Sequence, residues 1–282
     1  MAIAYEAAGE PRQPDSPTRA LTVLGWLPVS DPGTDAELRA RRASSFGDQA
    51  SAYARHRPDY PRAALEWGMS GANRPVRDVL DLAAGTGKLT QGLADLGRSV
   101  TAVEPDPGML AELSRRLPDV PALLGKAEDI PLPDESVDAV FVGQALHWFE
   151  LAPAFAQIRR VLRPGGVVAA LWNHDDESVP WVLEFSRLIR TGVSRGFTEA
   201  DQPLRAAGFG PFEQDQFAHT HRRTIESLLA TVATHSLLLV ASDDDRDRRL
   251  AEARAYLESV PETGTGEFDY PLVTTVLRAR RS

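Results

Sequence analysis

The stretch VLDLAAGTGKLT, residues 79–90, limits the possible folds of this chain more than any other segment. Its first half is an apolar run interrupted only by Asp81, as in a buried strand, and its second half opens a run with helical periodicity. Gly85 and Gly87 lie where the halves meet, and glycine allows backbone conformations that other residues avoid. A strand that enters a helix through such a turn is typical of open α/β sheets, which bind ligands at the carboxyl ends of their strands.

The residues after this turn continue to alternate between strand and helix patterns. Strands buried on both faces of a parallel sheet are continuous apolar runs, whereas helices have a periodic apolar face. Alternation at this spacing predicts a parallel sheet with right-handed crossovers. The expected strands are 76–83, 99–105, a short one within 121–129, 137–144 and 165–173, and the expected helices are 86–97, 106–117 and 151–162.

The two ends of the chain differ from this central part. Residues 1–45 are rich in Pro, Ala, Gly, Asp and Ser, so we expect a poorly ordered extension there. Residues 46–282 have the pattern of one globular domain. Two late strands, 214–223 and 271–280, are separated by two helical stretches. We therefore expect a helical insertion over 222–262 that covers one end of the sheet as a lid.

Composition excludes several classes of function. The formal net charge of −9 argues against a protein that binds nucleic acid by neutralising phosphates. The absence of cysteine excludes disulfides and thiolate metal sites. The chain has neither a secretory signal pattern nor an apolar run of about 20 residues, so we expect a cytoplasmic protein without a membrane span. His219 and His221 lie two apart on an expected strand, but no third ligand is near, so no metal site is predicted.

Two familiar phosphate-binding patterns do not fit the turn. A Walker-type loop needs glycine at position 82 and Ser or Thr at position 89, where this chain has Leu82 and Leu89. A dinucleotide fingerprint needs a third glycine where Thr90 stands. Asp81, four residues before Gly85, would also repel a pyrophosphate. A nicotinamide-dependent oxidoreductase is therefore disfavoured.

Asp81 instead suits a ligand that carries both a cation and a carboxylate. Its carboxylate can bind the cation, and the N–H groups at the start of the following helix can bind the anion. S-adenosylmethionine has this distribution of charge, with an ammonium, a carboxylate and a sulfonium. Glu104, at the end of the second strand, can accept hydrogen bonds from both ribose hydroxyls of an adenosine. Because NAD would use the same ribose contact, Asp81 is the residue that discriminates.

Four segments taken together resemble the class I S-adenosylmethionine-dependent methyltransferases. DLAAGTGK is similar to the first motif of that family, with Ala83 where glycine is commonest, and VEPDPGML resembles its ribose-binding segment. GKAEDIPLPDESVDAV resembles the adenine segment, and LRPGGVVAALW resembles the fifth-strand motif. The chain looks closest to the small-molecule group, type 11, that includes trans-aconitate-type and quinone methyltransferases. This resemblance implies a doubly wound, Rossmann-like α/β fold with a seven-stranded sheet, helices on both faces, and a helical insertion between the last two strands.

The resemblance also implies a set of site residues. FGDQASAYARHRPDYP is similar to a helix that covers the cofactor in the trans-aconitate-like group, where Arg57 would pair with the cofactor carboxylate; the alternative is a surface helix whose Arg57 caps acidic groups. His147, just past the fourth strand, is a candidate general base or substrate ligand, or else it packs the loop. The residues implied to bind S-adenosyl-L-methionine are Tyr53 and Arg57 as a cover, Asp81, Gly85 and Gly87 at the methionine part, Glu104 at the ribose, Met109, Ala127 and Glu128 at the adenine, and Gln144 at the sulfonium.

The function expected from this resemblance is methyl transfer from S-adenosylmethionine to an oxygen or carbon of a small organic acceptor, such as a carboxylic acid or a natural-product-like metabolite. The donor is already activated, so the protein has mainly to align the nucleophile and exclude water. The alternatives are a quinone-type ring C-methyltransferase and a non-catalytic protein that binds the cofactor and regulates a partner. No nucleic-acid or membrane partner is expected, and the protein is expected to be a monomer or a homodimer.

Overall fold

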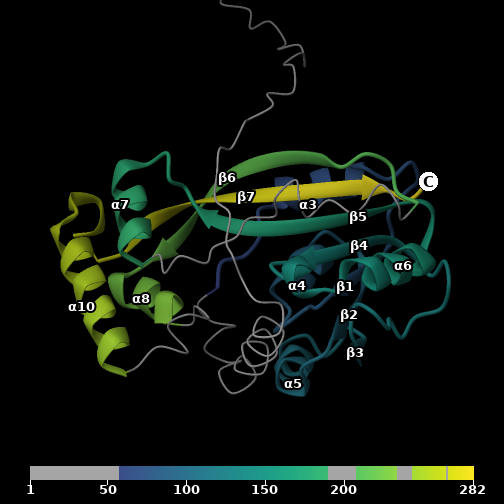
Figure 1. The fold of residues 1–282 in the computed structure, drawn as a ribbon, viewed down its shortest axis with the longest axis horizontal. Coiled ribbons are helices and arrows are strands. Elements are labelled where there is room, and N and C mark those ends of the chain that lie inside the picture. The colour runs from purple at the N-terminus through teal and green to yellow at the C-terminus, as the bar shows by residue number, and fades with distance from the viewer. Residues whose placement is uncertain (1–56, 190–207, 234–242, 265) are drawn as a thin grey trace, which may run out of the picture.

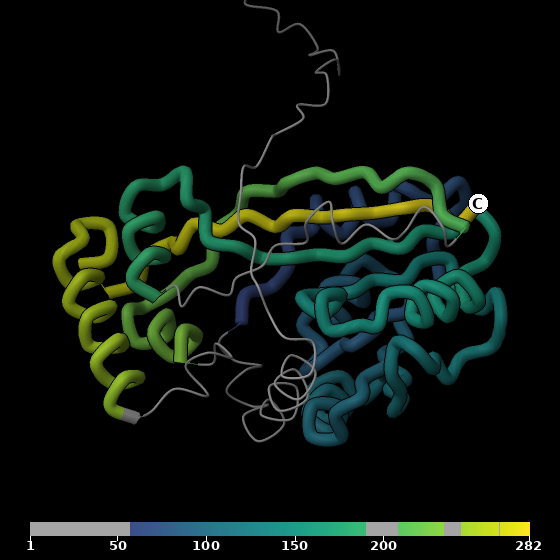
Figure 2. Tube along the Cα trace, viewed as in Figure 1, coloured from purple at the N-terminus to yellow at the C-terminus, as the bar shows by residue number. Residues whose placement is uncertain are grey.

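The structure, a computed structural model, describes residues 57–189, 208–233, 243–264 and 266–282 (Figures 1 and 2). The expected N-terminal extension lies outside these ranges. One sheet runs through the described chain. Its strands are β1 (Asp78–Leu82), β2 (Ser99–Glu104), β3 (Ala122–Leu124), β4 (Val137–Gly143), β5 (Leu162–Asp175), β6 (Glu213–Arg223) and β7 (Phe268–Arg280).

The strands follow the order β3-β2-β1-β4-β5-β7-β6 across the sheet. The first five strands pair in parallel, and β7 is antiparallel to both of its neighbours. The strand order reverses between β1 and β4, and open α/β sheets bind ligands outside the carboxyl ends of the strands at such a point. The seven-stranded sheet that the resemblance implied is confirmed.

Helices cover both faces of this sheet. The first four are α3 (Arg62–Ser70), α4 (Lys88–Asp95), α5 (Pro107–Arg116) and α6 (Leu151–Val161). On one face, Leu65 of α3 and Leu93 of α4 share an apolar core with Phe141 of β4. On the other face, Phe155 of α6 shares a core with Val140. Successive residues of β4 are therefore buried on opposite faces, which is why its apolar run is unbroken.

A second group of helices gathers at the far ends of β5, β6 and β7 (Figure 1). These helices are α7 (Pro180–Ile189), which follows β5, and α8 (Ile225–Ala233), α10 (Asp243–Ser259) and the 3-10 helix η5 (Pro261–Thr263), which come between β6 and β7. Phe185, Leu228 and Leu257 form a separate apolar core with Phe268 of β7. The helical insertion between the last two strands is thus confirmed. Within the described ranges, no helix is long and apolar enough to cross a bilayer.

β5 is longer than the strand expected from its apolar run, which ends at Asn173. It pairs with β7 over nine positions, from Val167 opposite Arg280 to Asp175 opposite Leu272. A partner strand extends β5 into polar residues, and local sequence alone does not reveal such pairing. The long strands β5 and β7 therefore connect the core of the sheet to the second group of helices.

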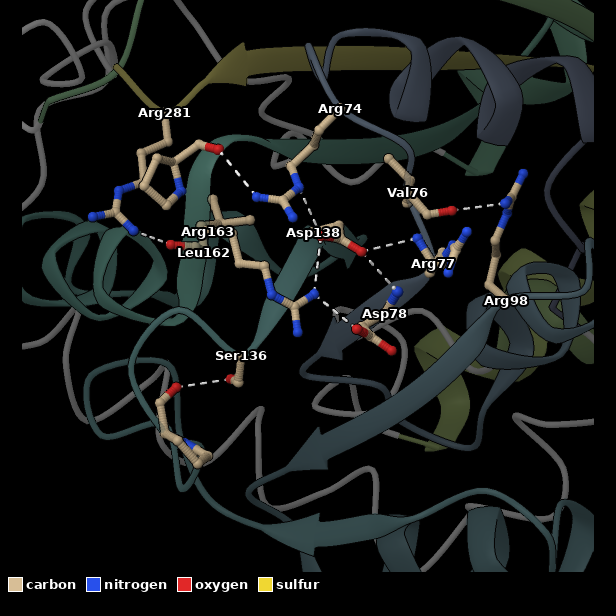
Figure 3. A network of polar contacts seen from close by, with 12 residues as sticks. Arg74, Val76, Arg77, Asp78, Arg98, Ser136, Asp138, Leu162, Arg163 and Arg281 are labelled. Carbon is tan, nitrogen blue, oxygen red and sulfur yellow. Dashed lines mark hydrogen bonds and ion pairs between the residues drawn. The ribbon is translucent and has the colours of Figure 1, made fainter.

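Asp138, at the start of β4, joins several segments at the amino-terminal end of that strand (Figure 3). It is 2% exposed. Its Oδ2 accepts the backbone N–H groups of Arg77 and Asp78 at 2.9 and 3.1 Å. Its Oδ1 lies 2.9 Å from both Arg74 Nε and Arg163 Nη1. Burial alone would raise the pKa of Asp138, but these backbone hydrogen bonds, followed by Arg163, outweigh burial and lower it.

Replacing Asp138 with Asn is expected to lower the free energy of unfolding by about 3 kcal/mol at pH 7, because the ion pairs lose their buried anion. A lowered pKa stabilises the fold above the ordinary pKa of Asp, and this stability is lost as the pH falls through the folded-state pKa. The difference between D138N and the wild type should therefore shrink below about pH 4. Thermal unfolding at pH 7 and in acid measures both effects.

The matched control is Asp134→Asn. The Asp134 carboxylate lies 2.9 Å from Arg160 Nη1, but its side chain is 74% exposed. Loss of an exposed pair should cost less than about 1 kcal/mol. Equal losses in the two variants would contradict the assignment of stability to the buried network.

Candidate functional site

A cavity opens at the carboxyl ends of β1 and β4, where the strand order reverses. The space within it, including the part open to solvent, measures about 490 Å³. Of the residues implied to bind the cofactor, Arg57, Asp81, Gly85 and Gln144 line it. In the described chain, three non-glycine residues have positive φ, and two of them, Ala83 and Gln144, are in its wall. Strained backbone of this kind collects at functional sites.

The turn between β1 and α4 has a left-handed backbone at alternate positions. The φ angle is 58° at Ala83, 57° at Gly85 and 85° at Gly87. Glycine adopts this conformation freely, whereas Ala83 adopts it at a cost of about 1–2 kcal/mol. α4 begins at Lys88, directly after the turn, and no side chain caps its N-terminus. The first N–H groups of α4 therefore give the cavity a positive end that suits an anion.

Asp81, the fourth residue of β1, places a buried carboxylate in the cavity wall. The residue is 0% exposed. Thr90 of α4 donates a hydrogen bond of 2.6 Å from its hydroxyl to Asp81 Oδ2, while Oδ1 has no partner among the residues that the structure describes. Burial raises the pKa of Asp81 to about 7, against the lowering effect of Thr90, and the neighbouring Glu104 raises it further. A buried oxygen without a donor beside a cavity is suited to a cationic group of a ligand.

Glu104, at the end of β2, is bonded to the turn that follows β1. Its Oε2 accepts the backbone N–H of Gly85 at 2.8 Å, and its Oε1 accepts that of Asp106 at 2.9 Å. Burial raises the pKa of Glu104 in spite of these two bonds. Each carboxylate oxygen has a second lone pair, so ribose hydroxyls could still donate to Glu104. Its predicted contact with ribose stays a prediction.

A chain of polar contacts forms the opposite wall. Gln144 donates from Nε2 to the backbone oxygen of Asn173 at 3.1 Å. Asn173 in turn donates from Nδ2 to the backbone oxygen of Asp59 at 3.2 Å. The Asp59 carboxylate pairs with Lys88 Nζ at 2.8 Å, which ties the segment before α3 to the start of α4. These contacts connect the ends of β4 and β5, the segment before α3 and the start of α4 around the cavity.

The residues expected at the adenine lie outside the wall of this cavity. Met109 and Ala127 are each 4% exposed and pack within the protein. Glu128 accepts the backbone N–H of Glu150 at 2.9 Å through Oε1. Their contacts with an adenine stay predictions.

His147 and Tyr53 complete the expected set. His147 is exposed in the 3-10 helix η2 (Leu146–Trp148) and is not in the wall of the cavity. Its ring centroid lies 4.7 Å from that of Trp148. The alternative that His147 packs the loop is thus supported by its contact with Trp148, and its role as a general base stays a prediction. Tyr53 lies outside the described residues.

Sequence reasoning missed three groups of the site. Thr90 entered only as the residue that breaks the dinucleotide fingerprint, yet its hydroxyl is the partner of Asp81. A hydroxyl in the first turn of a helix, beside a buried strand-end carboxylate, is a signal that could have identified it. Lys88 and Asp59 were missed because they are 29 residues apart, and only the fold brings them together.

A family model and two similar proteins all relate this chain to methyltransferases. A family model described as a methyltransferase domain matches residues 80–170. An uncharacterized methyltransferase of Mycobacterium tuberculosis is 40% identical over 236 residues, which cover 83% of this chain and 95% of that protein. An uncharacterized methyltransferase of Schizosaccharomyces pombe is 32% identical over 243 residues, which cover 84% of this chain and 97% of that protein.

A solved structure extends the likeness to the fold. A proposed type II methyltransferase from Anaeromyxobacter dehalogenans superposes with a TM-score of 0.61 at 29% sequence identity. The match covers 80% of this chain and 97% of the other. The likeness therefore includes the strands and helices beyond the stretch that the family model matches.

Replacing Asp81 with Asn is expected to stabilise the ligand-free protein at pH 8. A carboxyl whose pKa is raised favours folding below its ordinary pKa, and this contribution is lost as the pH rises through about 7. At pH 8 the wild type therefore buries a charge that D81N lacks, a difference of up to about 4 kcal/mol at 1.4 kcal/mol per pKa unit. Melting temperatures at pH 8, pH 5 and pH 3 measure the effect, which should fall to less than half at pH 5 and nearly vanish at about pH 3, below the ordinary pKa of Asp. A D81N protein less stable than the wild type at pH 8 would contradict it.

Proposed function

Because the chain belongs to the class I S-adenosylmethionine-dependent methyltransferases, we propose that it binds S-adenosylmethionine in the cavity at the end of β1. We propose further that it transfers the methyl group to an oxygen or carbon of a small organic acceptor. Asp81 Oδ1 carries this proposal, because it is a buried carboxylate oxygen to which no group of the described residues donates. Such an atom is costly unless a ligand supplies the partner.

The two charged ends of the cavity suit the amino-acid part of the cofactor. The carboxylate of Asp81 would accept the ammonium, and the N-terminus of α4, which no side chain caps, would accept the carboxylate. Arg57 is in the same wall and would add a positive charge for that carboxylate. The pairing is specific, because a pyrophosphate would face Asp81 with a charge of the same sign.

Methyl transfer is an in-line displacement, and the protein contributes alignment and shelter from water. The cofactor, when bound, supplies a methyl group already activated by its positive sulfur. The protein groups nearest to the acceptor side would be Gln144 and Asn173, whose positions their mutual hydrogen bond fixes. Such preorganisation can supply roughly 7–11 kcal/mol in favourable cases. His147 is the candidate general base for acceptors that must lose a proton.

The composition of the chain bears on where the enzyme acts and on what kind of substrate it takes. The acidic chain and the absence of cysteine favour a cytoplasmic enzyme that acts on small molecules rather than on nucleic acid. We propose a monomer or a homodimer. The lid formed by the helical insertion would exclude water during transfer.

The first test is calorimetric titration with S-adenosylhomocysteine, NAD and ATP. Saturable binding is expected for S-adenosylhomocysteine alone, and D81N should weaken it about 10–100-fold, since a hydrogen bond to a charged group contributes about 1.5–3 kcal/mol. Below pH 7 the affinity of the wild type should fall, because Asp81 must lose a proton before it can pair with the ammonium.

Asp95→Asn is the matched control, because Asp95 is an exposed carboxylate of α4 that bonds to Gln91. It should leave the affinity unchanged. Preference for NAD, or equal losses in D95N and D81N, would overturn the proposal. Binding of S-adenosylhomocysteine without turnover on any acceptor would favour the non-catalytic alternative.

A further inference from the structure

An ion pair at the edge of the cavity joins two segments that are far apart in the sequence. Lys88 Nζ lies 2.8 Å from Asp59 Oδ1. The two side chains are unequally covered, because Lys88 is 19% exposed and Asp59 is 72% exposed. Lys88 lines the cavity, whereas Asp59 does not, although its neighbours Pro58 and Tyr60 do. The covered cation therefore lies on the cavity side of the pair, and the exposed anion lies on the solvent side.

Lys88 occupies an electrostatically unfavourable position in α4. It is the first residue of the helix, directly after Gly87, and the first turn has neither an acidic residue nor a capping side chain. The N-terminus of a helix carries a partial positive charge, which repels a cation and attracts an anion. An exposed ion pair, such as the one with Asp59, offsets little of this repulsion. An anion bound inside the cavity would offset more of it.

A buried hydroxyl of the same turn also points to a bound group. Thr86, two residues before Lys88, is 1% exposed and lines the cavity. Its Oγ1 is buried and forms no hydrogen bond with any of the described residues. Its backbone oxygen accepts a hydrogen bond of 2.6 Å from Arg116 Nη1, which fixes the turn against α5. Buried hydroxyls ordinarily have a partner, so a ligand group is expected to complete the contacts at this end of the cavity.

The presence of lysine at this position favours an exchange of partners. Lys88 and Lys126 are the only lysines in a chain that has 31 Lys and Arg residues together. Arginine binds a carboxylate through a planar fork of fixed shape, whereas the ammonium of lysine is a compact charge on a flexible stem with several donors. Lys88 can therefore turn from one carboxylate to another while the backbone of α4 stays in place.

The other charged groups of the wall leave this exchange possible. Asp81 accepts its hydrogen bond from Thr90, and in the described part of the chain Lys88 forms an ion pair with Asp59 alone. Arg57 also lines the cavity, and in the proposed function it binds the cofactor carboxylate. A carboxylate offers about four lone-pair sites, so it can accept from Arg57, Lys88 and the N–H groups of α4 together. The contribution of Lys88 then adds to that of Arg57.

We propose that Lys88 is a ligand of the cofactor carboxylate and that it exchanges Asp59 for this carboxylate when the cofactor binds. Asp59 is then an internal competitor, which holds Lys88 Nζ in the ligand-free protein and takes it back as the product leaves. This inference rests on the proposed function, because it assumes that S-adenosylmethionine binds in the cavity. It goes further, because it predicts opposite effects for the two members of one ion pair.

The test compares Lys88→Gln with Asp59→Asn in the full chain, by calorimetric titration with S-adenosylhomocysteine. Both substitutions break the same ion pair. K88Q should weaken binding about 10–100-fold, as expected for loss of a charged hydrogen bond. D59N should tighten binding about 2–5-fold, because the ligand no longer has to replace an exposed ion pair. The backbone oxygen of Asp59 keeps its hydrogen bond from Asn173 in D59N, since only the side chain changes.

A control ligand and a control ion pair accompany this comparison. Methylthioadenosine has the nucleoside of the cofactor but lacks the amino-acid part, so its affinity should be equal in the wild type, K88Q and D59N. Arg62 and Glu66 form an exposed ion pair of 2.7 Å, and neither of them lines the cavity. Arg62→Gln and Glu66→Gln should therefore leave the affinity for S-adenosylhomocysteine unchanged.

NMR spectra can follow the exchange at Lys88 directly. A chain with isotope-labelled lysine Cε carbons gives two such signals, and the signal of Lys88 is the one absent from K88Q. In the ligand-free state this signal should differ between the wild type and D59N, because only the wild type has the carboxylate beside Nζ. With S-adenosylhomocysteine bound, the two signals should coincide, since Lys88 has then left Asp59.

Each other outcome has a definite meaning. Weaker or unchanged binding in D59N, a loss in K88Q that methylthioadenosine shares, or Lys88 signals that still differ in the bound state would overturn the inference. Equal effects of K88Q and D59N, with binding by the wild type intact, would refute the exchange alone. Failure of the wild type to bind S-adenosylhomocysteine would refute the proposed function, and the exchange with it. If K88Q does not fold, Lys88→Met replaces it, and the direction of the change in D59N still decides.

Discussion

The site depends on the buried carboxylate of Asp81, for which the described residues supply a hydrogen-bond donor to only one of its two oxygens. Asp81 is the last residue but one of a central strand, so neighbouring strands on both sides exclude water from it, and Thr90 donates a hydrogen bond to one of its oxygens. In the turn that follows, the Gly85 N–H donates to Glu104 instead of to Asp81. A polar residue in the middle of a core is ordinarily a defect. In the proposed function, Asp81 Oδ1 makes the cavity selective for a ligand that carries a cationic group.

Much of the sheet could be predicted because its signals are local. The apolar run of β4 and the glycines after β1 specify their own conformations, whatever the rest of the chain does. The extent of β5 could not be predicted, because Asn173 and Asp175 are in a strand only through pairing with β7, about a hundred residues later. The same reason hid the contact between Lys88 and Asp59. Asp81 could be identified from its position in the sequence, but its hydrogen bond with Thr90 depends on how α4 packs against β1 and could not be predicted.

Composition and local charge lead to different conclusions about partners. The chain as a whole has a formal net charge of −9, and that balance argued against anionic macromolecules. The wall of the cavity nevertheless carries charges of both signs, because Arg57 and Lys88 lie in it together with Asp81. Averages over a chain describe its long-range field, which salt screens within about 10 Å. A covered site is governed by the few charges that line it.

The two long strands that the apolar cores share have a thermodynamic consequence. The core beside α3 and α4 and the core of α7, α8 and α10 are separated on one sheet face by polar residues, and β5 and β7 are the covalent and hydrogen-bonded bridge between them. Apolar contacts couple the unfolding of neighbouring parts of a protein, and the polar residues between these two cores weaken that coupling. The helical core can therefore open as a separate cooperative unit while the sheet stays folded. Substitutions within the smaller core would then change the free energy of this local opening without changing the stability of the sheet to the same extent.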